Sequence, residues 1–119
     1  VGEPVATLFD YSGWEYELGE VRAGMRDAVT KSYGTAHTLN TLPFAVSAKT
    51  GSSQVSNNTK TNAFFVGYAP SEDPQIAMLV LIENAREGSL NAVPIAKDVF
   101  EWYYYNRISN GKNDLQPEQ

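Results

Sequence analysis

The chain has 119 residues, 42% of them hydrophobic, and carries a formal net charge of −5 with a pI of about 4.7. This length and composition suit one modest globular domain or part of a larger one. The acidic balance argues against a nucleic-acid partner, because phosphate binding requires a basic surface. With one histidine, His37, and no cysteine, we expect no metal site and no other cofactor. No apolar run is as long as a membrane span.

The first predicted element is a helix from Leu18 to Tyr33. Its apolar residues recur at helical spacing: Leu18, Val21, Met25, Ala28, Val29 and Tyr33. Gly34 follows the last turn and is expected to stop the helix. Ser12 and Glu15 have the spacing of a capping box, which predicts the start of the helix close to them.

Three short apolar runs follow, and each predicts a strand. They are Phe44–Ala48, Ala63–Ala69 and Ile76–Ile82. The connecting segments, Ser56–Lys60 and Pro70–Pro74, have the composition of turns and are too short for helical crossovers, so we expect neighbouring strands to run antiparallel. The third run is apolar throughout, which is typical of a strand covered on both faces.

A second helix is predicted near the end of the chain. Gly88-Ser89 loosens the backbone before it, and Pro94 fits its first turn. Helical spacing continues as far as Arg107 through a further apolar set: Ile95, Ala96, Val99, Phe100 and Tyr103. We interpret Trp102–Tyr105 as helix packing rather than an aromatic platform for a ligand. Helix, three-stranded antiparallel meander and helix make an α+β arrangement.

The sequence Lys49-Thr50-Gly51-Ser52 directly follows the first predicted strand. A strand edge with these residues would present an ammonium group, two hydroxyls and backbone N–H groups in one direction. Such groups suit a carboxylate and a carbonyl oxygen that lie alongside the strand. Gly51 lacks the Cβ atom that would obstruct the close approach of a ligand. Alone, the tripeptide K-T-G fits a solvated lysine in a surface turn better than a binding site.

Other motifs surround this tripeptide in a set order. They are Gly24-Met25, Gly34-Thr35-Ala36, Lys49-Thr50-Gly51-Ser52-Ser53-Gln54 and Phe65-Val66-Gly67-Tyr68-Ala69-Pro70. Over roughly residues 21–107 the set closely resembles the C-terminal part of the transpeptidase domain of class B penicillin-binding proteins. Ile82-Glu83-Asn84 and the Gly-Ser before the last helix are more similar to the elongation-type branch, PBP2, than to the division-type branch.

The resemblance implies both a fold and an activity. The three strands would belong to a larger five-stranded sheet of the kind shared by penicillin-binding proteins and serine β-lactamases. Residues 1–108 would be the C-terminal part of the transpeptidase domain. The polar composition of residues 109–119 separately predicts a mobile tail. The complete protein would be a serine D,D-transpeptidase that crosslinks peptidoglycan stem peptides through an acyl-enzyme and is acylated by β-lactams.

The resemblance also assigns roles to the K-T-G residues. Lys49 would support proton transfer and the electrostatics of the active site. The hydroxyls of Thr50 and Ser52 would bind the carboxylate of the stem peptide or of a β-lactam, beside Gly51. The backbone N–H of Ser52 would supply half of an oxyanion hole. Position 52 is serine where the family usually has threonine, and the hydroxyl is kept.

The nucleophile of the family is the serine of an S-x-x-K motif upstream of K-T-G, with S-x-N between the two. Three segments match these letters, but all of them follow K-T-G, and we interpret them as coincidences: Ser109–Lys112, Ser56–Asn58 and Ser89–Asn91. We therefore expect no nucleophile in this chain, which alone is catalytically incomplete. The expected partner is the remainder of the same protein, carrying both motifs as another chain.

Other functions stay open on the sequence alone. A β-lactam sensor or a catalytically dead scaffold of the same fold is the main alternative, followed by a β-lactamase and by an unrelated α+β binding domain. The resemblance implies an extracytoplasmic location, with the full-length protein anchored by an N-terminal transmembrane helix outside these residues. It also implies that Ile76–Ile82 is an inner strand, with one neighbour supplied by residues outside the chain.

Overall fold

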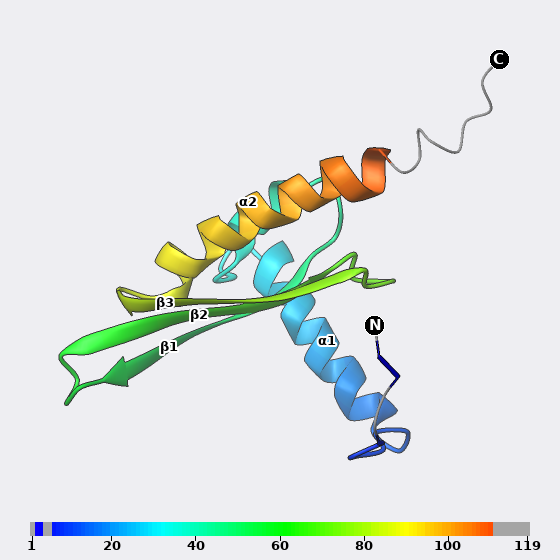
Figure 1. The fold of residues 1–119 in the computed structure, drawn as a ribbon, viewed down its shortest axis with the longest axis horizontal. Coiled ribbons are helices and arrows are strands. Elements are labelled where there is room, and N and C mark those ends of the chain that lie inside the picture. Colours follow the sequence, from blue (N-terminus) through cyan, green and yellow to red (C-terminus); the bar gives the residue numbers. More distant parts are fainter. Residues whose placement is uncertain (1, 4–5, 111–119) are drawn as a thin grey trace.

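The computed structural model describes residues 2–3 and 6–110. Its elements are helix α1 (Glu15–Thr30), 3-10 helix η1 (His37–Thr41), strands β1 (Ser47–Val55), β2 (Lys60–Ala69) and β3 (Ile76–Ala85), π-helical turn η2 (Gly88–Ala92), helix α2 (Val93–Tyr103) and π-helical turn η3 (Tyr104–Ser109). Figure 1 shows α2 running along the sheet and α1 crossing near the start of β1. The predicted α+β class is confirmed. Most of the predicted tail, residues 111–119, lies outside the described residues.

The three strands form one antiparallel sheet in the order β1-β2-β3, which confirms the predicted meander. The first strand differs from its prediction, since it begins at Ser47 rather than Phe44 and continues to Val55 rather than Ala48. Hydrophobicity stops at Ala48, but backbone pairing does not. The register continues through Thr50 opposite Phe65 to Val55 opposite Lys60. The K-T-G residues therefore lie within a paired strand.

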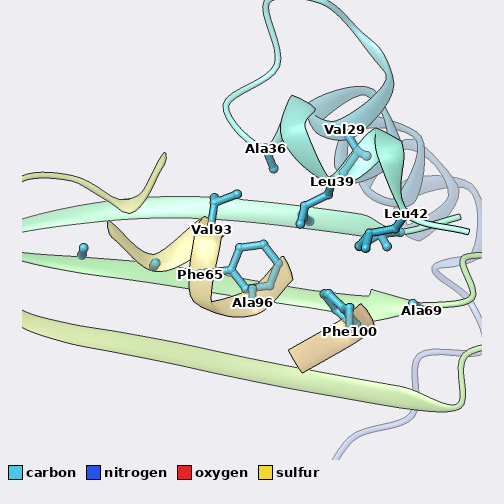
Figure 2. Close-up of a cluster of buried hydrophobic side chains, with 13 residues drawn as sticks. Val29, Ala36, Leu39, Leu42, Phe65, Ala69, Val93, Ala96 and Phe100 are labelled. Carbon is cyan, nitrogen blue, oxygen red and sulfur yellow. The ribbon is translucent and has the colours of Figure 1, made fainter. Parts of the chain in front are cut away.

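The hydrophobic core lies between one face of the sheet and α2. Figure 2 shows Phe65 of β2 facing Phe100 of α2, and their rings meet edge to face at 6.2 Å. Val29 of α1 and Leu39 of η1 extend this core past the start of β1. All four side chains are fully buried, and each such burial contributes about 1.5–3 kcal/mol. The core fixes the sheet, and with it the K-T-G strand, against both helices.

Helix α1 is displaced from its prediction by three residues at each end, because it runs from Glu15 to Thr30. The predicted capping box does not form: the N-cap residue is Trp14, and no side chain caps the helix. Instead, the backbone N–H of Ser12 donates to Asp10 Oδ1 at 2.9 Å. That bond, with a second from the Ser12 hydroxyl, lowers the pKa of the exposed Asp10 carboxyl.

The helix is terminated by its C-cap residue Lys31, whose backbone is extended (φ −79°, ψ 141°), rather than by Gly34. Gly34 has a different use, because a Cβ atom there would lie 2.2 Å from the backbone oxygen of Ala28. The loop folds back on the helix at this point, and the N–H of Ala36 donates to the same oxygen at 3.1 Å. Glycine permits this close approach.

Among the described residues, β3 is not buried on both faces as predicted. One face contributes Ile76, Met78, Val80 and Ile82 to the edge of the core. On the other face, where α1 reaches only Tyr68 and Ala77 near the start of β3, Leu79 is 65% exposed and Leu81 46% exposed. In the described sheet β3 is an edge strand that pairs only with β2. A second neighbour from outside the chain stays a prediction.

The C-terminal helix begins as predicted, but α2 ends at Tyr103 rather than at Arg107, and the π-helical turn η3 continues it to Ser109. Pro94 lies in the first turn of α2, as predicted. Packing explains only part of the aromatic run, since Tyr104 contacts Phe44 at 5.3 Å between rings while Trp102 remains 57% exposed. The guanidinium of Arg107 lies 6.0 Å from the Trp102 ring centre.

Among the described residues, no helix combines the length and apolar character needed to span a membrane.

Candidate functional site

The K-T-G residues lie on the outer edge of the sheet. Strand β1 pairs with β2 on one side, and on the other side no strand lies among the described residues. Alternate backbone N–H and C=O groups of such an edge are left without a strand partner and can pair with an extended ligand. Lys49 and Ser52 are exposed, and Thr50 and Gly51 are half-buried. The structure thus places all four residues in one accessible stretch of β1.

The side chains of this stretch do not all point in one direction, contrary to the prediction. Thr50 and Ser52 lie opposite Phe65 and Ala63, so they share the face that α2 covers. Lys49 lies opposite Val66 and occupies the other face, where its Nζ donates to the backbone oxygen of its neighbour Thr50. The reason is the two-residue period of a regular strand. The ammonium and the hydroxyls can therefore contact the same ligand only if that ligand lies along the edge of β1, where both faces are within reach.

The hydroxyl of Thr50 has a partner from outside the strand. Thr50 Oγ1 and Thr35 Oγ1 share a hydrogen bond of 2.7 Å. Thr35 is held in place by its neighbours, since Gly34 packs against the end of α1 and Ala36 is fully buried. The motif Gly34-Thr35-Ala36 therefore brings a hydroxyl to the K-T-G strand. The motif was identified from the sequence, but its hydrogen bond with Thr50 was not predicted.

The hydroxyl of Ser52 also has a partner, which the sequence did not reveal. The backbone N–H of Gly88 donates to Ser52 Oγ at 3.2 Å. The segment Gly88-Ser89 was predicted only as a loosening of the chain. In the structure it begins the π-helical turn η2, and Gly88 is buried. Two elements distant in the sequence thus contact the two hydroxyls that the resemblance assigns to a carboxylate.

The start of β1 is tied to its surroundings by polar contacts. Arg26 of α1 donates from Nη1 to the backbone oxygen of Val46 at 2.7 Å. The buried Ser47 shares a hydrogen bond of 2.9 Å with the hydroxyl of Ser71. The N–H of Ser71 in turn donates to the oxygen of Ala45 at 2.9 Å. These bonds link the strand to α1 and to the turn after β2.

A groove of about 620 Å³ lies near these contacts, on the side of Tyr68. Its lining residues come from α1, the end of β2, the following turn and β3: Arg22, Tyr68, Ser71, Glu72, Pro74 and Ala77. None of the K-T-G residues belongs to it. The chemistry predicted for β1 therefore lies on the strand edge rather than in this groove.

The segments that imitate the missing motifs have structural uses. Ser56, Asn57 and Asn58 adopt positive φ angles of 53°, 55° and 66° in the turn between β1 and β2. Asn91 accepts backbone N–H groups on its side-chain oxygen and so shapes the turn before α2. Of the third segment, Ser109 ends η3, while Lys112 lies outside the described residues.

The fold and the open K-T-G strand edge are those of a transpeptidase-like domain. Comparison of the sequence with protein families assigns the chain to one family. Residues 15–101 match the family described as the penicillin binding protein transpeptidase domain, and the chain belongs to this family. It is similar to the peptidoglycan D,D-transpeptidases MrdA of Acinetobacter baumannii (29% identical over 91% of the chain) and of Haemophilus influenzae (30% identical over 82%). The chain spans 17% of the length of either relative.

Solved structures show the same relationship. Pseudomonas aeruginosa PBP2 in complex with WCK 5153 is 33% identical, with a TM-score of 0.67 over 88% of this chain and 22% of that chain. Helicobacter pylori PBP2 in complex with MreC has a TM-score of 0.71 over 89% of this chain and 20% of that chain. At 23% identity the latter supports the fold alone. The comparisons confirm the predicted family, a class B PBP2-like transpeptidase domain, and its fold.

Proposed function

We propose that this chain is the K-T-G-bearing portion of an elongation-type penicillin-binding protein. The complete protein would be a serine D,D-transpeptidase that crosslinks peptidoglycan stem peptides and is acylated by β-lactams. The observation that supports this most strongly is the hydroxyl pair of β1: Thr50 and Ser52 lie on an open strand edge, each hydrogen-bonded by a separate element. Relatives named peptidoglycan D,D-transpeptidase support the reaction class.

The edge of β1 can bind a stem peptide by strand addition. An extended peptide would pair with the backbone of β1, and its carboxylate would accept hydrogen bonds from the hydroxyls of Thr50 and Ser52. Gly51 lets the ligand approach closely. The backbone N–H of Ser52 would stabilise the developing oxyanion, and the Lys49 ammonium would stabilise negative charge and assist proton transfer at the nucleophile.

The remaining parts of the site would come from the rest of the same protein. We infer that it carries the nucleophilic serine of S-x-x-K and the S-x-N motif, and that it forms the opposite wall of the cleft. The acyl-enzyme would form on that serine, with loss of the terminal residue of the donor stem peptide. An extracytoplasmic location, with a membrane anchor outside these residues, agrees with a peptidoglycan substrate.

A fluorescent penicillin tests this proposal directly. The complete protein is expected to form a covalent adduct that survives denaturation, while the isolated 119-residue chain is expected to stay unlabelled because it has no placed nucleophile. Gel fluorescence and mass spectrometry of peptides would locate the adduct. An adduct on any serine of this chain, or an unlabelled complete protein, would contradict the assignment. A complete protein that is acylated but does not crosslink stem peptides would instead be a β-lactam sensor.

The threonine pair gives a second expected result. In the complete protein, Thr50→Val should slow acylation by benzylpenicillin at least about tenfold, since a hydrogen bond to a charged group contributes roughly 1.5–3 kcal/mol. Thr35→Val should slow it about threefold to fivefold, since a hydrogen bond between neutral groups contributes roughly 1 kcal/mol. Benzylpenicillin methyl ester, which lacks the carboxylate charge, should be affected less. Thr38→Val, in the exposed part of η1, is the matched control. Equal rates for Thr35→Val and the parent protein with both compounds would show that the threonine contact has no role in binding.

A further inference from the structure

The turn that precedes α2 makes an unusually close approach to the K-T-G strand. A Cβ atom on Gly88 would lie 2.5 Å from the backbone oxygen of Phe64 and 2.7 Å from that of Gly51. Real Cβ atoms do not come this close to backbone oxygen, so no other residue fits here without displacing the turn. Gly51 and Phe64 are paired across β1 and β2. Gly88 therefore rests directly on the backbone of the glycine in K-T-G.

This turn is held by its own hydrogen bonds. The side-chain oxygen of Asn91 accepts the backbone N–H of Arg86 at 2.8 Å and of Glu87 at 3.1 Å. The N–H of Asn91 donates to the oxygen of Glu87 at 3.0 Å. The turn then enters the core through Ala92 and Val93, which are buried. Gly88 is thus fixed between the strand and the helix.

The contact restricts the directions in which the Ser52 hydroxyl proton can point. A serine hydroxyl has a single proton and two lone pairs. Because Ser52 Oγ accepts the N–H of Gly88, one lone pair is occupied and the proton remains available to donate. A carboxylate can only accept hydrogen bonds, so the orientation of Ser52 matches a ligand that carries one.

We propose that Gly88 is a positioning residue of this site, which holds the Ser52 hydroxyl as a donor to the ligand carboxylate. The inference rests on the proposed function and adds a determinant of ligand preference to it. Gly88 acts through Ser52 rather than by touching the ligand. Its loss should therefore reduce discrimination between carboxylate-bearing and neutral ligands.

The experiment measures second-order acylation rates of the complete protein with benzylpenicillin and with its methyl ester. For Gly88→Ala we expect about a tenfold loss with the acid and a much smaller loss with the ester, because a charged acceptor loses more when a donor is misplaced. Gly19→Ala is the matched control, since a Cβ atom there meets nothing within 4 Å. Equal losses with both compounds, or no loss with either, would overturn the inference.

A double-mutant cycle with Ser52→Ala separates positioning from a general structural effect. If Gly88 acts through the hydroxyl, Gly88→Ala should cause no further loss of the acid-to-ester ratio once Ser52→Ala is present. Multiplicative losses would overturn the inference. Asn91→Ala loosens the same turn without a steric clash and decides the matter if Gly88→Ala does not fold. It should lower the ratio about threefold, and only when the Ser52 hydroxyl is present; an unchanged ratio would count against the proposal.

Failure of this inference can be told apart from failure of the proposed function. A parent protein that is acylated and prefers the acid, with variants that keep the same preference, would remove the role of Gly88 and leave the transpeptidase assignment intact. A parent protein that neither compound acylates would overturn the proposed function and the inference with it.

Discussion

Lys49→Ala in the complete protein is expected to slow acylation by benzylpenicillin at least ~100-fold, the scale of a lost acid–base group. Its free energy of unfolding should change by less than about 0.5 kcal/mol, as for most exposed residues. Lys49 is exposed, lies on the face of β1 away from α2, and donates only to the backbone of Thr50 among the described residues. The side chain of the K-T-G lysine therefore contributes little to the stability of the described fold.

Stopped-flow acylation and chemical denaturation of the same preparations would give both quantities. Lys60→Ala is the matched control, because Lys60 is also exposed and lies at the start of the neighbouring strand. Lys49→Arg separates charge from proton transfer, since arginine keeps the charge but does not deprotonate in proteins. We expect it to recover only part of the lost rate. If Lys49→Ala acylates at the parent rate, this lysine is merely the solvated end of a strand.

The sequence predicted the sheet better than the ends of its elements. Short connectors required antiparallel pairing, and β2 and β3 contain their predicted runs. The polar half of β1 was missed because hydrophobicity marks burial, whereas backbone pairing with β2 extends the strand to Val55. The start of α1 was missed because Ser12 bonds to Asp10 rather than to the helix. Both errors concern local hydrogen bonds, which hydrophobic patterns do not encode.

The candidate site could be located from the sequence but not assembled from it. The K-T-G motif identified the residues, and the set of surrounding motifs identified the family. The contacts that orient the hydroxyls join residues 15 positions apart, Thr35 to Thr50, and 36 apart, Gly88 to Ser52. No periodicity within one element can reveal such pairs. The opposite placement of Lys49, in contrast, follows from strand alternation and could have been predicted.

The exposed face and the open edge of β3 lead to the second large expected effect. Val66, Leu79 and Leu81 are exposed on the face opposite α2, being 45%, 65% and 46% accessible. The edge of β3 away from β2 has no strand partner among the described residues. An apolar strand with an open edge favours uncontrolled pairing between molecules. The isolated 119-residue chain is therefore expected to self-associate at micromolar concentration.

In the complete protein we expect a strand from outside this chain to pair with β3 and a further element to cover its exposed leucines. Hydrogen exchange measures the pairing. Amides on the outer edge of β3 should exchange at least ~100-fold more slowly in the complete protein than in the isolated chain, because their opening would require disruption of the sheet. Amides on the outer edge of β1 are the internal control: that edge should stay open for the substrate and exchange readily in both samples.

Substitution of Leu79 and Leu81 tests whether an element covers their face of β3, independently of whether a strand pairs with the edge of β3. Leu79→Lys with Leu81→Lys should keep the isolated chain in solution, since charge on an exposed strand opposes association. The same pair should destabilise the complete protein by several kcal/mol, because each lysine would be buried without a partner. Sedimentation and denaturation would report the two effects. An isolated chain that is monomeric, with β3 amides exchanging as they do in the complete protein, would show that β3 is an edge strand in both and that no outside strand completes this sheet.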